Sequence, residues 1–204
     1  MPRPRSLSTE QIANAALAVL DRDGLTALSM RAVAAELGTG TMSLYRYVTD
    51  REQLERLILD AVLADFDPLA PPALPWAGRI RLLTGRIRAA VFTHPAVVPL
   101  FLTHRHLTQG GQRWAEGMLG ALTEAGLAGA DRVIAFRALV SYVIGALQAE
   151  SLGPLSGAGT VVLAALPTDE FPLLAATAAD ASAVAPDVEF GRGLDLVLRG
   201  LGAE

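Results

Sequence analysis

The chain has 204 residues, of which 51% are hydrophobic and 19% charged, with a net charge of −4 and no cysteine. This content excludes a disordered chain, which needs low hydrophobicity and high net charge. The lack of cysteine excludes disulfides, thiolate metal sites and cysteine nucleophiles, and a pI of about 5.4 excludes a surface that is basic throughout. A mean hydropathy of +0.37 is high for a soluble monomer, so we expect a partner to cover part of the apolar surface.

Neither a signal peptide nor a membrane span is predicted. No long apolar run follows the basic start Met1-Pro2-Arg3-Pro4-Arg5 before Glu10, as a signal peptide requires. The longest stretch without Asp, Glu or Arg, residues 151–168, contains three glycines and two prolines, which do not suit a spanning helix. We therefore expect a cytoplasmic protein without membrane contact.

Helical periodicity dominates from the start of the chain. Ser8 and Gln11 have the spacing of a capping box, so they predict a first helix, which Gly24 ends. Ser29 is a good N-cap for a second helix that ends at Gly38. A third, short helix follows, and a fourth begins at Thr49 or Asp50. The inner faces of the third and fourth helices are formed by Leu44, Val48, Leu54, Leu57, Ile58, Ala61 and Val62.

Four prolines between residues 67 and 75 forbid a continuous helix there and predict a boundary between modules. We expect a DNA-binding domain at 1–49, a connecting helix at 50–67, and a ligand-binding and dimerisation domain at 68–204. The last domain is expected to contain helices at about 76–93, 96–103, 109–125, 131–150 and 188–201. A loop is expected at 153–159, followed by an irregular stretch that holds Phe171 and Pro172. The fold class is all-α.

Residues 29–48 have the pattern of a helix-turn-helix, in which the second helix enters the major groove of DNA. The outward positions of the third helix are small, polar, aromatic or cationic, and no acid lies between Gly38 and Thr49. Such a face can approach phosphates without repulsion. Residues 1–64 nevertheless carry seven arginines against eight acids, so the positive charge must be local. A generic three-helix core with a solvated face remains the alternative interpretation.

The run Leu44-Tyr45-Arg46-Tyr47-Val48, followed by a capped helix at Asp50-Arg51-Glu52-Gln53-Leu54, resembles the DNA-binding domain of the tetracycline-repressor (TetR) family over residues 8–66. His94-Pro95 and the segment 190–195 resemble the regulatory domain of the tetracycline-repressor branch. Together with the charge pattern, this resemblance implies DNA contacts by Arg3, Arg5, Ser29, Arg31, Thr41, Met42, Ser43, Tyr45, Arg46, Tyr47 and Arg51.

The family pattern also implies a role for individual residues in this set. Ser29 would meet a phosphate through the helix N-terminus, and Arg31 would reach a base edge, where Arg pairs well with guanine. Residues 41–43 would face bases, with Met42 suited to the methyl group of thymine. Tyr45, Tyr47 and Arg51 would contact phosphates, and Tyr47 stands where many family members have His. Arg3 and Arg5 would follow the backbone or the minor groove.

The segment 131–150 has no charge between Arg137 and Glu150 and is apolar nearly all round, so it must be buried on every side. It is either a fully internal core helix or one that pairs with a partner, and the last helix repeats the pattern. The resemblance implies that both helices pair with their copies in a four-helix dimer interface, although the sequence leaves open which apolar face does so. The predicted interface residues are Leu139, Val140, Val143, Leu147, Phe190, Leu194, Val197 and Leu201.

The resemblance places a ligand pocket between about Trp76 and Glu150. Phe66 and Phe101 stand at aligned positions where tetracycline repressors hold a drug–magnesium chelate with His and acidic residues, so a more hydrophobic effector than tetracycline is implied. No cofactor or metal is expected. The candidate ligand-binding residues are Phe66, Phe92, His94, Phe101, His104, His106, Trp114, Phe136, Tyr142, Gln148 and Glu150; each can also be an ordinary core or surface residue.

The residues do not favour an enzyme. All three histidines lie between positions 94 and 106, and none has the spacing of a metal site such as H-E-x-x-H. Gly38-Thr39-Gly40 is too short for a phosphate loop. We therefore predict a dimeric repressor that binds a palindromic operator and is released by a small hydrophobic effector, through a shift of the fourth helix. A constitutive DNA-binding regulator of the same fold is the alternative.

Overall fold

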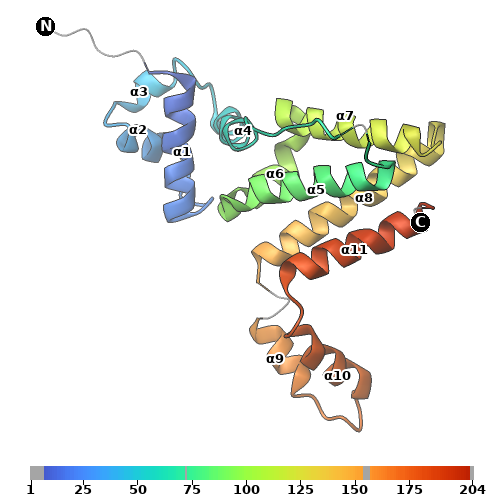
Figure 1. The fold of residues 1–204 in the computed structure, drawn as a ribbon. Coiled ribbons are helices and arrows are strands. Elements are labelled where there is room, and N and C mark those ends of the chain that lie inside the picture. Colours follow the sequence, from blue (N-terminus) through green and yellow to red (C-terminus); the bar gives the residue numbers. More distant parts are fainter. Residues whose placement is uncertain (1–6, 72, 154–156, 203–204) are drawn as a thin grey trace, which may run out of the picture. The chain divides into compact units, whose positions relative to one another are not determined.

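A computed structural model describes residues 7–71, 73–153 and 157–202, and within these residues it contains helices and no strand (Figure 1). The predicted arm residues Arg3 and Arg5 lie outside the described part. The chain divides into two compact units, which we call unit 1 (Met1–Leu69 and Gly85–Gly117) and unit 2 (Ala70–Thr84 and Met118–Glu204). The all-α class is thus confirmed.

Unit 1 begins with the helices α1 (Thr9–Asp23), α2 (Met30–Glu36), α3 (Thr41–Leu44) and α4 (Arg51–Val62). The local signals work as predicted, because Ser8 and Gln11 form a complete capping box and Ser29 and Asp50 cap α2 and α4. Helix α3 is a single turn, shorter than the sequence suggests. The three-helix core is closed by fully buried residues, including Ile12, Leu20, Leu28, Val33, Leu44 and Val48.

The rest of unit 1 comes from α5 (Trp76–Phe92), a 3₁₀ turn (Pro95–Val97), α6 (Val98–His104), a second 3₁₀ turn (Arg105–Leu107) and α7 (Gln109–Glu124). Unit 1 contains the C-terminal part of α5 and the N-terminal part of α7. Helix α4 packs against α6. The first turn of α7 lies so close to the preceding 3₁₀ turn that a Cβ at Gly111 would be 1.9 Å from the carbonyl oxygen of Arg105.

Unit 2 contains α8 (Gly129–Ser151), α9 (Ala158–Ala164), α10 (Pro172–Ala181) and α11 (Pro186–Gly200). Helix α8 packs against α11, and α9 packs against α10. The predicted irregular stretch at Phe171 and Pro172 is wrong, because Pro172 begins α10. The backbone N–H of a residue in the first helical turn has no partner within the helix, so proline, which lacks this N–H, loses no hydrogen bond there. Its fixed φ also suits a helix. The loop predicted at 153–159 is also too long, since α9 begins at Ala158.

Helix α8 buries only one face within the chain. Ala135, Leu139, Val143 and Leu147 are buried, whereas the opposite face is open, with Ile134 66% exposed. The expected burial on every side is therefore met on one side only within the chain. Among the described residues, α8 is also the helix whose length and composition would fit a membrane span, a test that core helices of soluble proteins pass as well.

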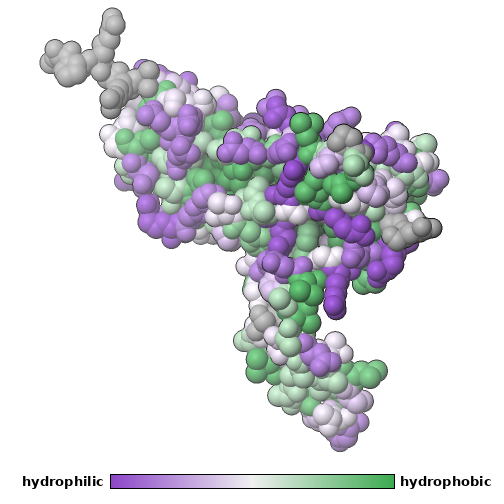
Figure 2. Space-filling view, in the orientation of Figure 1, coloured by the Kyte–Doolittle hydropathy of each residue, from purple (hydrophilic) through white to green (hydrophobic). Residues whose placement is uncertain are grey.

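The α9–α10 hairpin carries a further exposed apolar surface, seen in the lower part of Figure 2. Leu173 is 82% exposed, Val161 67% and Val162 65%. The high mean hydropathy of the chain thus has a structural counterpart in α8 and this hairpin. Surfaces of this kind mark interaction sites more often than they mark free surface.

Candidate nucleic-acid interface

The predicted recognition residues lie together on and just after α3. Met42 is 79% exposed and Tyr45 46%. Arg31 on α2 and Arg46 after α3 are exposed as well, and Thr41, Ser43 and Tyr47 are half-buried. Leu44 and Val48 are fully buried on the opposite side. They anchor α3 to the core, while the polar side of α3 remains exposed to solvent. This arrangement fits a helix that is inserted into a groove of DNA.

The turn between α2 and α3 depends on Gly38. Its φ is +61°, in the left-handed region, where residues with a Cβ are strained. The N–H groups of Gly38 and Thr39 donate to the carbonyl oxygens of Ala35 and Ala34, which satisfies the open end of α2. Glycine at this position therefore sets the direction in which α3 leaves α2.

Ser29 and Arg51 already have intramolecular roles. The Ser29 hydroxyl oxygen accepts the N–H of Ala32 at 3.2 Å. The Arg51 guanidinium donates to the Leu25 carbonyl oxygen at 3.0 Å and to the Glu55 carboxylate at 2.7 Å. Arg51 therefore ties α4 to the loop after α1, a role that its place in the sequence does not reveal. An arginine has five N–H donors, so some remain for a phosphate.

Helix α4 is tied to α6 and α7 by two polar contacts of its acidic residues. The second carboxylate oxygen of Glu55 lies 2.9 Å from Nε2 of His104, which is 9% exposed. Asp60 accepts the backbone N–H of Gln109 at 3.1 Å. A continuous chain of polar contacts thus runs from the DNA-binding helices to the end of α6. It passes from the carbonyl oxygen of Leu25 through the side chains of Arg51 and Glu55 to His104.

The pKa values of Glu55 and Asp60, both on α4, shift in opposite directions. Burial alone would raise the pKa of Glu55, but the hydrogen bonds from Arg51 and His104 outweigh it and hold this pKa below its ordinary value. Burial raises the pKa of Asp60, and the N–H of Gln109 and the charge of Arg56 offset this only in part. Glu55 is therefore firmly ionised at neutral pH.

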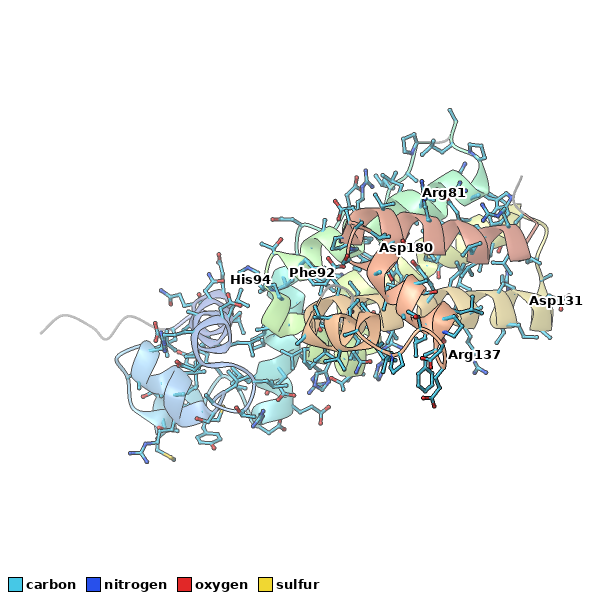
Figure 3. The ribbon with its side chains drawn as sticks, turned by 90° about the horizontal axis from the view of Figure 1, so that it is seen from below. Arg81, Phe92, His94, Asp131, Arg137 and Asp180 are labelled. Atoms are coloured by element: carbon cyan, nitrogen blue, oxygen red, sulfur yellow. The ribbon has the colours of Figure 1, made fainter. Side chains whose placement is uncertain are left out.

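The ligand candidates in unit 1 do not form a single cluster. Phe92 and His94 lie close together at the end of α5 (Figure 3), where Nδ1 of His94 is 2.6 Å from Asp21 of α1. Phe66 and His94 line a groove of about 640 Å³ between α1, α4 and α5. The rings of the buried Phe101 and Trp114 are 6.0 Å apart, and the indole N–H of Trp114 has no hydrogen-bond partner within the described residues.

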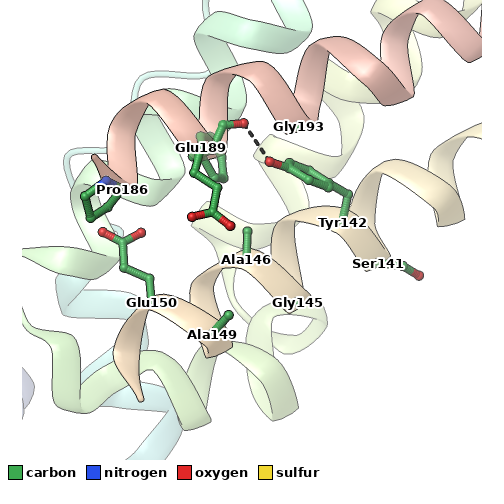
Figure 4. A pocket seen from close by; sticks show the side chains of 10 residues that line it. Ser141, Tyr142, Gly145, Ala146, Ala149, Glu150, Pro186, Glu189 and Gly193 are labelled. Carbon is green, nitrogen blue, oxygen red and sulfur yellow. Dashed lines mark hydrogen bonds between the residues drawn. The ribbon is translucent and has the colours of Figure 1, made fainter. Parts of the chain in front are cut away.

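The ligand candidates in unit 2 lie along α8. Tyr142 and Glu150 line a groove of about 360 Å³ between α8 and α11 (Figure 4), whereas Gln148 is exposed and Phe136 half-buried. The hydroxyl of Tyr142 donates to the Phe190 carbonyl oxygen at 2.6 Å. This contact requires the glycine at 193, because a Cβ there would lie 2.4 Å from the Tyr142 hydroxyl.

The predicted interface residues differ in how much surface they can contribute. Leu139, Val143 and Leu147 are fully buried in unit 2, and Phe190 and Leu194 nearly so. These residues form part of the chain's own core, and their place in a dimer interface stays a prediction. Val140, Val197 and Leu201 are half-buried. The exposed apolar residues of the same helices are Val133, Ile134, Val188 and Leu196.

No group of three or more His, Asp or Glu residues in the described part of the chain is placed to hold a metal ion. The geometry instead offers an exposed recognition turn and a second, apolar helical unit. A short helix presented in this way, with a larger helical module attached, is the architecture of DNA-binding regulators of the helix-turn-helix type.

The chain belongs to the TetR family of bacterial regulators. Residues 7–56 match the family model "Bacterial regulatory proteins, tetR family", and residues 68–204 match "Tetracyclin repressor-like, C-terminal domain". The HTH-type transcriptional repressor DrrR1 of Streptomyces coeruleorubidus is 31% identical over 98% of this chain and 78% of its own length. An HTH-type transcriptional regulator of Saccharopolyspora erythraea is 32% identical over 72% of this chain and 62% of its own length.

Solved structures agree with the family. The TetR family protein ActR of Streptomyces coelicolor, in complex with (S)-DNPA, matches with a TM-score of 0.83 and 28% identity, over 98% of this chain and all of that chain. ActR in complex with actinorhodin matches with a TM-score of 0.82 and 28% identity, over 98% of this chain and 97% of that chain. The chain is thus a transcriptional regulator, and its relatives are not enzymes.

Proposed function

We propose that this chain is a dimeric repressor that binds a near-palindromic operator through α3 and releases it when a small hydrophobic effector binds the C-terminal module. The observation that carries the proposal is the exposed, acid-free surface of residues 39–49, anchored by the fully buried Leu44 and Val48. The likeness to ActR, a relative solved with actinorhodin and with (S)-DNPA, supports the effector. In a two-fold dimer the half-sites lie about 34–36 Å apart.

The response to an effector is proposed to pass through α4. The polar chain from Leu25 through Arg51 and Glu55 to His104 joins the DNA-binding helices to α6. A displacement of α6 therefore pulls on α4 through a charged, partly buried contact. Coupling free energies between two sites are typically about 1–3 kcal/mol, so the operator is released in part rather than absolutely.

A constitutive regulator without a small ligand is the second candidate function. The contacts of His94 with Asp21 and of His104 with Glu55 favour it, because two of the polar ligand candidates already have partners within the chain. The two functions differ in one measurable property, the effect of a small molecule on operator affinity.

A thermal-shift screen with small hydrophobic compounds, repeated with operator DNA present, tests the proposal. A true effector raises the melting temperature of the free protein and lowers the stabilisation that the operator provides, because it favours the released state. Compounds that bind without changing operator affinity would favour the constitutive regulator. Failure to bind any sequence near the chain's own promoter at low salt would contradict both functions.

Replacing Arg31 by Ala is expected to relax base specificity at one position of each half-site. A bidentate contact between arginine and guanine contributes about 1–3 kcal/mol of discrimination, and Arg31 is exposed on α2. Fluorescence anisotropy with operators that vary at single positions measures this effect. Arg113→Ala, at an exposed position of α7, provides the control for charge. An equal loss on every sequence would show that Arg31 contacts a phosphate.

Replacing Glu55 by Gln is expected to lower the free energy of unfolding by about 1.5–3 kcal/mol at pH 7, the range for hydrogen bonds to charged groups. The pKa of Glu55 is lowered in the folded protein, so its ionic contribution is present at neutral pH and is lost as the pH falls through that lowered pKa. Urea unfolding between pH 7 and pH 3 should show the two proteins converging. Glu52→Gln, a substitution at an exposed position of the same helix, should show no comparable loss of stability. A difference in unfolding free energy between the original protein and Glu55→Gln that stayed constant across the pH range would show that the ionised form of Glu55 is not its source.

A further inference from the structure

The open face of α8 carries one positive charge, and the groove beside that face is lined by two carboxylates, those of Glu150 and Glu189. Along the exposed side of α8, from Val133 to Gln148, Arg137 is the charged residue, and it has no ion pair within the described part of the chain. Figure 3 labels Arg137 on α8. Glu189 projects from α11 into the groove of about 360 Å³ (Figure 4) and is exposed and likewise unpaired among the described residues.

Arg137 and Glu189 cannot meet within one chain. The groove is lined by the C-terminal half of α8 and the N-terminal half of α11, and Glu189 of α11 lies across it from Ala146 of α8. Arg137 and Ala146 are nine residues apart, which is about 13 Å along a helix that rises 1.5 Å per residue. A second copy of the chain can supply an oppositely charged partner for each.

The shape of the open face indicates how a second copy would sit. The exposed residues between Arg137 and Gln148 are small, namely Ala138, Ser141 and Gly145, and a Cβ at Gly145 would meet nothing within 4 Å. Two helices approach most closely where their facing side chains are small. A two-fold axis near Ser141, with the two α8 helices antiparallel, places Arg137 of one copy beside Gly145 of the other.

We propose that Arg137 of each copy enters the groove between α8 and α11 of the other and pairs with Glu189 there. This inference rests on the dimer of the proposed function and adds its register and its selectivity. The two-fold symmetry makes the contact reciprocal, so each dimer contains the pair twice. The groove is mostly lined by apolar and small residues, including Ala146, Ala149 and Phe190, so the stem of the arginine packs while its charge is neutralised.

Charge reversal of each partner separately tests the proposal. In Glu189→Arg two arginines face each other at both contacts, and in Arg137→Glu two glutamates do. Charge pairs at interfaces couple strongly, and juxtaposed like charges are costly, so each single variant should raise the dimer dissociation constant by about tenfold or more. Sedimentation velocity measures the constant. Arg113→Glu on α7 of unit 1 makes the same charge change as Arg137→Glu and should leave it unchanged.

Mixing the two single variants gives the sharpest result. In a heterodimer of Arg137→Glu with Glu189→Arg, both contacts again join opposite charges. The mixture should therefore form heterodimers in clear preference to either homodimer, as native mass spectrometry shows when one chain carries a tag. The double variant Arg137→Glu/Glu189→Arg should recover the dissociation constant of the original protein to within about threefold.

Two outcomes would overturn the inference. One is a dimer that tolerates both single reversals, and the other is a mixture in which the subunits pair at random. Circular dichroism checks that each variant stays helical, which is expected because both residues are exposed. A chain that is monomeric at micromolar concentration before any substitution would instead contradict the dimer of the proposed function.

Discussion

Replacing Leu196 by Glu is expected to convert the dimer to a monomer and to weaken operator binding by about 10²–10⁴-fold. Leu196 is 65% exposed on α11, on the face that the chain itself leaves uncovered. A leucine buried in an interface contributes about 1.5–3 kcal/mol through the hydrophobic effect, and the symmetry doubles the loss. A dimer that contacts two half-sites at once binds about 10²–10⁴-fold more tightly than a single subunit on one half-site. A monomer loses this gain.

The same substitution should leave the fold intact. Glu at 196 lies four residues after Arg192 and three before Arg199, spacings at which opposite charges attract along a helix. Sedimentation velocity and fluorescence anisotropy on a two-half-site operator measure the two effects. Leu69→Glu is the matched control, because Leu69 is 74% exposed in unit 1. If the Leu196 variant remained a dimer, α11 would not form the contact surface.

Replacing Leu44 by Ala is expected to lower the free energy of unfolding by about 2–5 kcal/mol, the range for a buried leucine replaced by alanine. Leu44 is fully buried and ends α3, a helix of four residues. A single helical turn does not persist in water by itself, so its position depends on this anchor. Operator affinity should fall together with stability, as urea unfolding and anisotropy measure.

Met42→Ala separates anchoring from recognition. Met42 lies on the same turn but is 79% exposed, so its truncation creates no cavity and should change stability by less than about 0.5 kcal/mol. Its loss should still weaken binding wherever Met42 contacts a thymine methyl. If Met42→Ala destabilised the protein as much as Leu44→Ala does, Met42 could not face outward from α3 as the structure has it.

The ends of the helices were predictable because their signals are local. Ser8 with Gln11, Ser29 and Asp50 each satisfy N–H groups within three residues along the chain, so the sequence contains both partners of every contact. The family motif at residues 44–48 was readable for a similar reason, since it packs and presents one short segment. Helix α10 was missed because the prediction took Phe171-Pro172 as an interruption, although a proline there begins a helix.

The contacts of the candidate site were less predictable. Arg51, His94 and His104 were selected as DNA or ligand contacts, yet each has a partner far along the chain, at Leu25, Asp21 and Glu55. Nothing in the residues near these histidines indicates a carboxylate that is 49 or 73 positions away, or near Arg51 a carbonyl oxygen that is 26 positions away. Only packing in three dimensions brings such groups within hydrogen-bonding distance.

By itself, the sequence determined the all-α class, the exposed turn after α2 and the excess of apolar side chains, because composition and short-range pattern encode these properties. The tertiary structure decided which face of α8 serves which purpose. A helix that is apolar nearly all round has no polar side to mark as outward, so the sequence could not separate core from contact surface. Packing against α11 buries Leu139, Val143 and Leu147 and leaves Ile134, Arg137 and Gly145 exposed, and this packing defines the apolar surface that the chain leaves uncovered.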